Sequence, residues 1–197
     1  MKGGRRDSGI ATLIKQQNLS WSPSMIASAI STTATKYDHT IEMILSKGYD
    51  LGTSYPSTPF DISASLVNPE RAVDPGLVFT PEEYVAFLCS LPKINEGEVE
   101  AASGGSCNHP LEHRANLNLP SVTITYLVGS QVVSWNGINV GGKQETYLYA
   151  VLPPNGVIVD LNVTQVAKDF SFREIVLTGS LDHIVRIPLL VLPVSMS

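Results

Sequence analysis

The chain has 197 residues, of which 43% are hydrophobic and 16% are charged, which fits one or two globular domains and excludes a disordered protein. The net charge of −5 and a short, terminal basic run (Lys2, Arg5, Arg6) give no reason to expect nucleic acid as a partner. No stretch reaches the roughly 18 apolar residues of a membrane-spanning helix, and no apolar segment follows the basic start, so we expect neither a membrane span nor a secretory signal.

The first third of the chain is predicted to be helical. Residues 9–16 place Ile10, Leu13 and Ile14 on one side of a short helix. A second helix begins after Ser22, the expected cap, with proline at its first position. Its many small residues favour close packing against a neighbour, so we expect it to be buried.

Residues 36–79 lack periodicity and contain turn signals, including Tyr55-Pro56 and Asn68-Pro69, so an irregular surface run is predicted. Asp74-Pro75-Gly76 is predicted to close this run with a turn. Thr80, Pro81 and Glu83 then indicate a capped helix that ends near Ser90. Residues 93–114 are polar and contain glycine, so a loop is predicted there.

From about Leu117 the pattern changes to short alternating runs separated by turns, which is typical of a β-sandwich. Turns are predicted at Gly141-Gly142, at 153–156 and at Gly179-Ser180. The predicted strands cover residues 122–126, 132–133, 146–152, 157–163, 172–177 and 184–191.

Ser8 lacks the surroundings of a catalytic serine. A nucleophilic serine needs a base and oxyanion donors, and the strand–turn–helix pattern that exposes such a serine is absent around it. Asp7 is only its neighbour in sequence, so we interpret Ser8 as a solvated residue at a helix end. No glycine-rich phosphate loop is present, so no cofactor is expected.

Histidine and cysteine also give weak signals. His39 and His183 each follow an aspartate and are interpreted as exposed turn residues. Cys107, His109 and His113, with Cys89 as a fourth ligand, match no established zinc spacing, so no metal is expected.

Two further features bear on the compartment. Cys89 and Cys107 suit one disulfide if the compartment is oxidising, whereas two free thiols are the alternative. Asn18 and Asn162 each begin an N-glycosylation pattern, which is common by chance.

Three stretches resemble the plant subtilisin-like serine proteases (subtilases). GIATLIKQQNLSWSPSMIASAISTTA resembles the helices that follow the nucleophile. STPFDISASLVNPERAVDPGLVF and EEYVAFLCSL resemble the end of the catalytic domain and the crossover from it. ANLNLPSVTI, VGGKQETYLYAVLPPNGVIVDL and EIVLTGSLDHIVRIPLLVLP resemble the C-terminal fibronectin type III-like domain. The resemblance covers nearly the whole chain from Gly9, in the family's order.

The resemblance implies a register for the missing chemistry. The family's Gly-Thr-Ser motif would place its nucleophile at about Met1, and the family's catalytic Asp, His and oxyanion Asn come earlier still. The chain also departs from the family at Ser63-Ala64-Ser65, at Ser134-Trp135-Asn136-Gly137 and near Leu161, where a strand is expected to be missing.

The resemblance therefore implies an α+β, mostly β chain in three parts. Residues 1–79 would be the end of a subtilisin-like peptidase domain, 80–114 a helix and connecting loop, and 115–197 a fibronectin type III-like sandwich. We expect a chain inactive by itself, derived from an extracellular peptide-hydrolysing enzyme and associated with protein, such as a protease catalytic domain.

Two alternatives remain open at this point. One is a non-catalytic extracellular interaction module built on the sandwich, and the other is an incomplete reading of a larger protease. Without a catalytic sheet, Ile10, Leu13, Ile14, Met25 and Ile30 are expected to be exposed and to cause aggregation or dependence on a partner.

Overall fold

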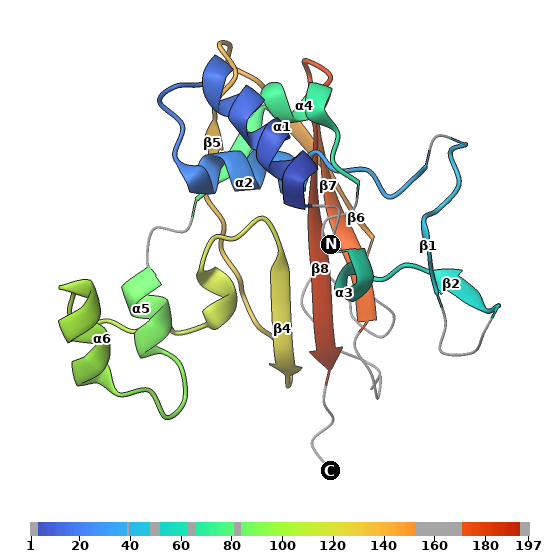
Figure 1. Cartoon of the computed structure of the whole chain (residues 1–197). Coiled ribbons are helices and arrows are strands. Elements are labelled where there is room, and N and C mark those ends of the chain that lie inside the picture. Colours follow the sequence, from blue (N-terminus) through green and yellow to red (C-terminus); the bar gives the residue numbers. More distant parts are fainter. Residues whose placement is uncertain are drawn as a thin grey trace.

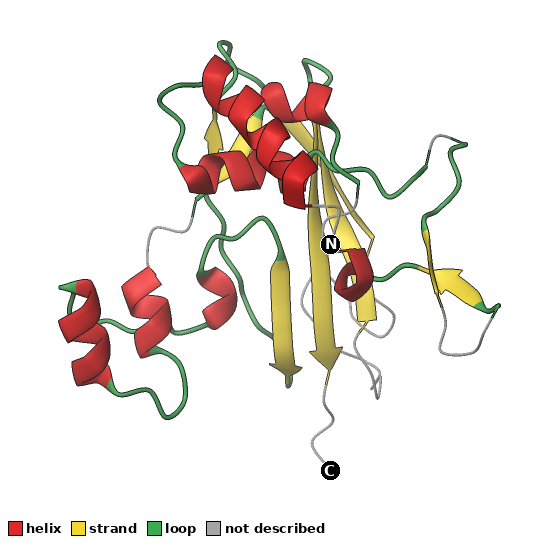
Figure 2. Cartoon of the chain, in the orientation of Figure 1, coloured by secondary structure: helices red, strands yellow, loops and turns green. Residues whose placement is uncertain are grey.

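The computed structural model shows helices packed on one end of a β-sheet, with a two-stranded arm on one side and a pair of short helices on the other (Figure 1). The arrangement is mixed α/β with several sheets (Figure 2). No helix in the part of the chain described has the length and apolarity to span a bilayer. The structure describes residues 4–38, 40–47, 52–62, 66–80, 84–152 and 171–193.

The two helices predicted in the first third of the chain are both present. Helix α1 (Gly4–Gln17) begins before the predicted residue 9, and α2 (Pro23–Thr32) begins where the cap predicts. Ser22 Oγ accepts a hydrogen bond from the Met25 amide at 3.2 Å, which satisfies one of the free donors of the first turn. Of the small residues of α2, Ser28 and Ala29 are buried, as expected, whereas Ala27 is exposed.

The apolar face of these helices is covered within the chain, so the expectation that it is exposed was wrong for most of its residues. Ile14 is fully buried, and Ile10, Met25 and Ile30 are partly buried against the cluster to which Ile14 belongs. Only Leu13 among the five expected residues is largely exposed, at 58%. This face is covered by Trp21, Ala72, Val73, Val78 and Val140. We call the covering residues and the apolar face of the two helices together the helical core.

The run 36–79 contains short elements, so the prediction of an irregular run was wrong. Tyr55-Pro56, predicted as a turn, lies in a strand of the arm (β1–β2), which projects at the right of Figure 1. Asn68 caps a helix by accepting a hydrogen bond from the Arg71 amide at 3.2 Å. Strands of three residues have no measurable period. The elements are β1 (Leu45–Lys47), β2 (Ser54–Pro56), α3 (Pro59–Ile62), α4 (Pro69–Val73) and β3 (Leu77–Phe79).

The main sheet has the order β4-β8-β7-β6. The β4–β8 pair is parallel, and β8–β7 and β7–β6 are antiparallel. These four strands confirm four of the predicted runs, whereas the predicted strand 157–163 lies outside the described residues. The strands are β4 (Val122–Leu127), β6 (Tyr147–Leu152), β7 (Ser171–Gly179) and β8 (Ile184–Pro193).

The strand predicted at 132–133 was wrong, and a strand lies at β5 (Gly137–Asn139) instead. The Asn118 side chain accepts a hydrogen bond from the Asn136 amide at 2.8 Å and donates one to the Asn136 carbonyl at 3.0 Å. These bonds occupy the backbone groups that a sheet partner would use just before β5.

Strand β3 separates two hydrophobic cores and pairs with β5 in a second, antiparallel sheet. Val78 is fully buried in the helical core. Phe79, on the opposite face because strand side chains alternate, lies in the core of the main sheet. That second core, the sheet core, contains Phe79, Val122, Ile124, Leu127, Val185, Ile187, Leu189 and Val191.

The loop predicted at 93–114 was also wrong, because it contains α6 (Glu96–Ser103). The Asn95 side chain accepts from the Glu98 amide and donates to the Glu98 carboxylate, and Gly104 ends the helix in the left-handed conformation. Helix α6 packs on α5 (Tyr84–Cys89), and a single 3₁₀ turn follows at Arg114–Asn116. The three-part domain division stays a prediction.

Candidate functional site

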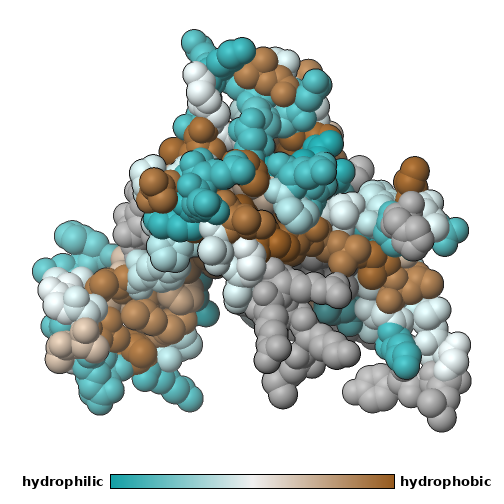
Figure 3. All heavy atoms as spheres, turned by 45° about the horizontal axis from the view of Figure 1, so that its top comes forward, coloured by the Kyte–Doolittle hydropathy of each residue, from teal (hydrophilic) through white to brown (hydrophobic). Residues whose placement is uncertain are grey.

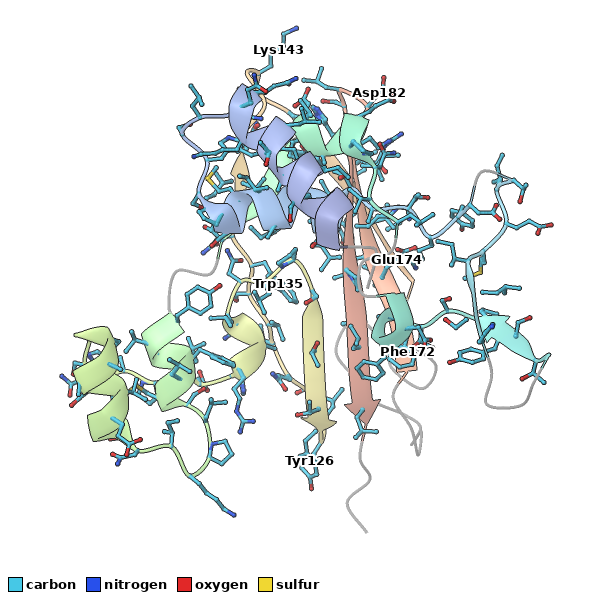
Figure 4. The ribbon with its side chains drawn as sticks, viewed as in Figure 1. Tyr126, Trp135, Lys143, Phe172, Glu174 and Asp182 are labelled. Atoms are coloured by element: carbon cyan, nitrogen blue, oxygen red, sulfur yellow. A yellow bond between two sulfur atoms is a disulfide. The ribbon has the colours of Figure 1, made fainter. Side chains whose placement is uncertain are left out.

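A cluster of polar side chains joins three segments at one end of the main sheet. Asp74 directly follows α4, Tyr147 is the first residue of β6 with Glu145 two residues before it, and His183 directly precedes β8. Lys143 and Asp182, sequence neighbours of this cluster, are labelled at the upper end of the molecule in Figure 4. We call Asp74, Glu145, Tyr147 and His183 the His183 cluster.

The His183 imidazole lies between two carboxylates. Its Nδ1 is 2.6 Å from Glu145 Oε2, and its Nε2 is 3.3 Å from Asp74 Oδ1. The Glu145 side chain is 1% exposed and also accepts hydrogen bonds from the Tyr147 hydroxyl at 2.7 Å and the Leu181 amide at 3.0 Å. Asp74 is different, because its side chain is 68% exposed.

The surroundings of each group determine its charge. Burial opposes ionisation of Glu145, but hydrogen bonds from Tyr147, Leu181 and His183 outweigh burial and lower its pKa. Burial opposes protonation of His183, but the hydrogen bonds to Glu145 and Asp74 raise its pKa above the ordinary value. Burial and the Glu145 carboxylate raise the pKa of Tyr147, which therefore stays protonated. The arrangement favours an imidazolium between two carboxylates.

Two glycines allow the segments to approach. Gly76 has a φ of +73°, and a Cβ there would collide with the Tyr147 hydroxyl and the His183 ring. A Cβ at Gly179 would collide with the Glu145 carboxylate. The sequence marks both glycines as turn residues, but it does not show that the two turns enclose the same cluster.

The interpretation of His183 as an exposed turn residue was wrong. Its side chain is 14% exposed, because Glu145, 38 residues earlier, reaches its ring from the segment before β6. The adjacent Asp182 has positive φ in the turn and is not the acid that pairs with His183. No local sequence signal could have found Glu145 as the partner.

Among the described residues, His109, His113 and the two cysteines do not join the cluster. His109 is exposed in the segment after α6, and His113 is half-buried at the start of the 3₁₀ turn. Cys89 and Cys107 form a disulfide with a Cα–Cα distance of 5.5 Å, so neither sulfur is a free thiolate ligand. His39 lies outside the described residues.

The remaining sequence candidates lie in α1, directly after it, or outside the described residues. Ser8 is exposed, as interpreted, but it lies within α1 and not at a helix end; its carbonyl accepts a hydrogen bond from the Thr12 hydroxyl at 2.8 Å. The side-chain amide of the half-buried Asn18 donates hydrogen bonds to the Ile14 and Val73 carbonyls, each at 3.4 Å. Asn162, Ser63-Ala64-Ser65 and Leu161 lie outside the described residues.

A second ionic group, which sequence reasoning missed, lies on the main sheet. Glu174 of β7 is buried, with Lys36 Nζ 2.9 Å from Oε2 and Arg186 Nη1 3.2 Å from Oε1. Figure 4 shows Glu174 partway along the sheet, away from the end where Lys143 and Asp182 lie. The sequence did contain a signal for this group, because Glu174 is a carboxylate inside a run that is predicted to be a strand.

Comparison with known proteins gives relatives over most of the chain. The chain is 50% identical over 92% of its length to subtilisin-like protease SBT2.4 of Arabidopsis thaliana, and 34% identical over 93% of its length to subtilisin-like protease SBT2.5 of the same plant. Subtilisin-like protease SBT5.3 of the same plant is 37% identical over 85%. The chain spans about a quarter of the length of these relatives: 24%, 26% and 22%. No protein-family model matches.

Proposed function

The chain belongs to the plant subtilisin-like proteases, as a part of one, and we propose that it is a non-catalytic scaffold of a serine endopeptidase. The parent reaction is peptide-bond hydrolysis, in which a histidine takes a proton from a serine and an acid orients the histidine. The state of His183 supports the proposal. Both of its ring nitrogens face carboxylates, so neither faces a serine hydroxyl.

The C-terminal part is proposed to be a fibronectin type III-like sandwich. Two sheets contribute to the sheet core: Phe79 comes from the β3–β5 sheet, and Val122 and Val185 come from the main sheet. Two sheets that pack on a common core are the defining feature of a sandwich. The described pairs β3–β5, β6–β7 and β7–β8 are antiparallel, as in such a sandwich, whereas β4 and β8 pair in parallel.

An extracellular location is part of this proposal. The Cys89–Cys107 disulfide supports it, because disulfides persist in oxidising compartments. Glycosylation at Asn18 has less support, because the Asn18 amide donates to two backbone carbonyls.

A protease catalytic domain is the proposed partner. Figure 3 shows hydrophobic side chains running from the centre of the molecule to the β1–β2 arm at its right. Exposed apolar surface of this kind is typical of an interface. The exposed apolar residues of the arm and of the segments next to it are Ile41, Met43, Leu45, Tyr55 and Phe60.

A stand-alone interaction module is the second candidate function. The covered face of α1 and α2 favours it, because Ile14 and Ile26 are buried by residues of the same chain. A chain with a closed helical core is able to fold without a partner. Size-exclusion chromatography separates the two candidates: a stable monomer favours the module, and aggregation relieved by a catalytic domain favours the scaffold.

A fluorophosphonate probe tests the proposed lack of catalysis. The probe reacts with activated serines, so the full chain is expected to remain unlabelled and to leave an unfolded protein substrate intact. Ser8→Ala is the matched control. Stoichiometric labelling that Ser8→Ala abolishes would overturn the proposal and make Ser8 a nucleophile.

A further inference from the structure

We propose that the His183 cluster is a pH-operated latch that holds the turn between α4 and β3 against the end of the main sheet. This inference does not rest on the proposed function. Asp74 belongs to the turn, which connects Val73 at the end of α4 to β3 with Val78, and both valines belong to the helical core. Glu145 and His183 belong to the main-sheet side, so the carboxylate–imidazolium–carboxylate bridge spans two parts of the molecule.

The two ends of the bridge are unequal. Glu145 is buried and held by three donors: Tyr147, the Leu181 amide and His183. Asp74 is mostly exposed, and its contact with Nε2 is longer, at 3.3 Å against 2.6 Å for Glu145. When the imidazolium loses one proton to solvent, the shorter contact with the buried carboxylate keeps the remaining proton on Nδ1. Nε2 then has no hydrogen to donate, and the Asp74 carboxylate is released to water.

The neighbouring charges do not replace this bridge. Glu70 and Arg71 of α4 are exposed, and so are Lys143 before β6 and Asp182 in the β7–β8 turn. Exposed charges are screened by water and salt, so they shift the latch less than the two carboxylates in contact with the ring.

The direction of the pH effect follows from the two shifts. The raised pKa of His183 contributes stability that is complete below its ordinary value of 6.5 and is lost as pH rises through the raised value. The lowered pKa of Glu145 contributes stability above its ordinary value of 4.5 that is lost as pH falls through the lowered value. The latch is therefore tightest between these ordinary values, in mildly acidic solution, and opens as pH rises through the raised pKa of His183.

The test compares urea unfolding of the full chain at pH 5.5 and pH 8.5. The unfolding equilibrium constant of the unmodified chain should rise from pH 5.5 to pH 8.5, and Asp74→Asn should reduce that rise by at least about three-fold. Asp182→Asn is the matched control, an exposed aspartate beside the same histidine, and should leave the rise unchanged.

Proton NMR titration of the His183 ring gives a second readout, assigned with His183→Gln. The ring should titrate above 6.5 in the unmodified chain and closer to 6.5 in Asp74→Asn. The latch is refuted if His183 titrates at or below 6.5, or if Asp74→Asn and Asp182→Asn have the same pH dependence. Asp74 is exposed, so its substitution leaves the fold available for both measurements.

Discussion

Gly76 determines how closely the α4–β3 turn approaches the main sheet. Gly76→Ala is expected to destabilise the chain by about 1–3 kcal/mol, because the residue has positive φ and a methyl group would meet Tyr147 and His183. Urea unfolding measures this loss. Gly142→Ala is the control, since a Cβ at Gly142 has no neighbour within 4 Å. Equal stability of the two variants would show that the turn relaxes without cost.

Single residues were the least predictable level of this molecule. The sequence identifies Gly76 and Gly179 as turn residues; Gly76 lies in the bend before β3, whereas Gly179 is the last residue of β7, directly before the turn. It could not show that His183 is buried, because Glu145 and Asp74 reach it from distant segments. Local pattern describes a residue's neighbours along the chain, whereas the charge of His183 depends on neighbours in space.

Helix α2 is attached to β3 by a buried hydrogen bond. Ser28 Oγ accepts from the Phe79 amide at 2.8 Å, and Ser28 is 1% exposed. Ser28→Ala should cost about 1–3 kcal/mol of unfolding free energy, because it leaves that amide buried without its acceptor. Ser24→Ala, half-buried on the same helix, should change stability by less than about 0.5 kcal/mol. Thermal or urea unfolding of both variants checks this, and matching losses would contradict it.

Elements were predictable in proportion to their length and their end signals. The Ser22-Pro23 start of α2 and the long alternating runs of β7 and β8 were visible in the sequence. Helix α6 was missed although its signals were present, with Asn95 and Glu98 at the start and Gly104 at the end. Strands β3 and β5 have three residues each and are far apart in the sequence. They form by pairing with each other, so neither has a local signal.

The whole molecule is expected to unfold in one step, because β3 belongs to both cores. The two tryptophans report separately on this: Trp21 lies in the helical core, and Trp135 packs against the sheet core. The variants Trp135→Phe and Trp21→Phe each leave one reporter. Their fluorescence transitions in urea, corrected for any change in overall stability measured by circular dichroism, should coincide with the circular dichroism transitions. A separate, earlier transition of either reporter would show that the cores are independent.

Family membership was the most predictable property of the chain. The resemblance carried by the Trp-Ser-Pro helix and the C-terminal strands is confirmed by relatives at up to 50% identity. The family comparison misled on one point, the exposure of the apolar helical face. In this chain, Ala72 and Val78 cover Ile14, so a partner sheet is not needed to bury it.

Strand β3 limits how this sequence can be exchanged between relatives. A recombination crossover between Val78 and Phe79 would take these two residues from different relatives. Each core would then contain a β3 residue that evolved beside other neighbours. A crossover after Phe79 would separate that ring from the β4 and β8 residues on which it packs. Successful chimaeras are therefore expected to inherit Leu77–Phe79 together with Gly137–Asn139 and both cores. The two halves of the chain would then evolve as one heritable unit, even if their ancestors were separate.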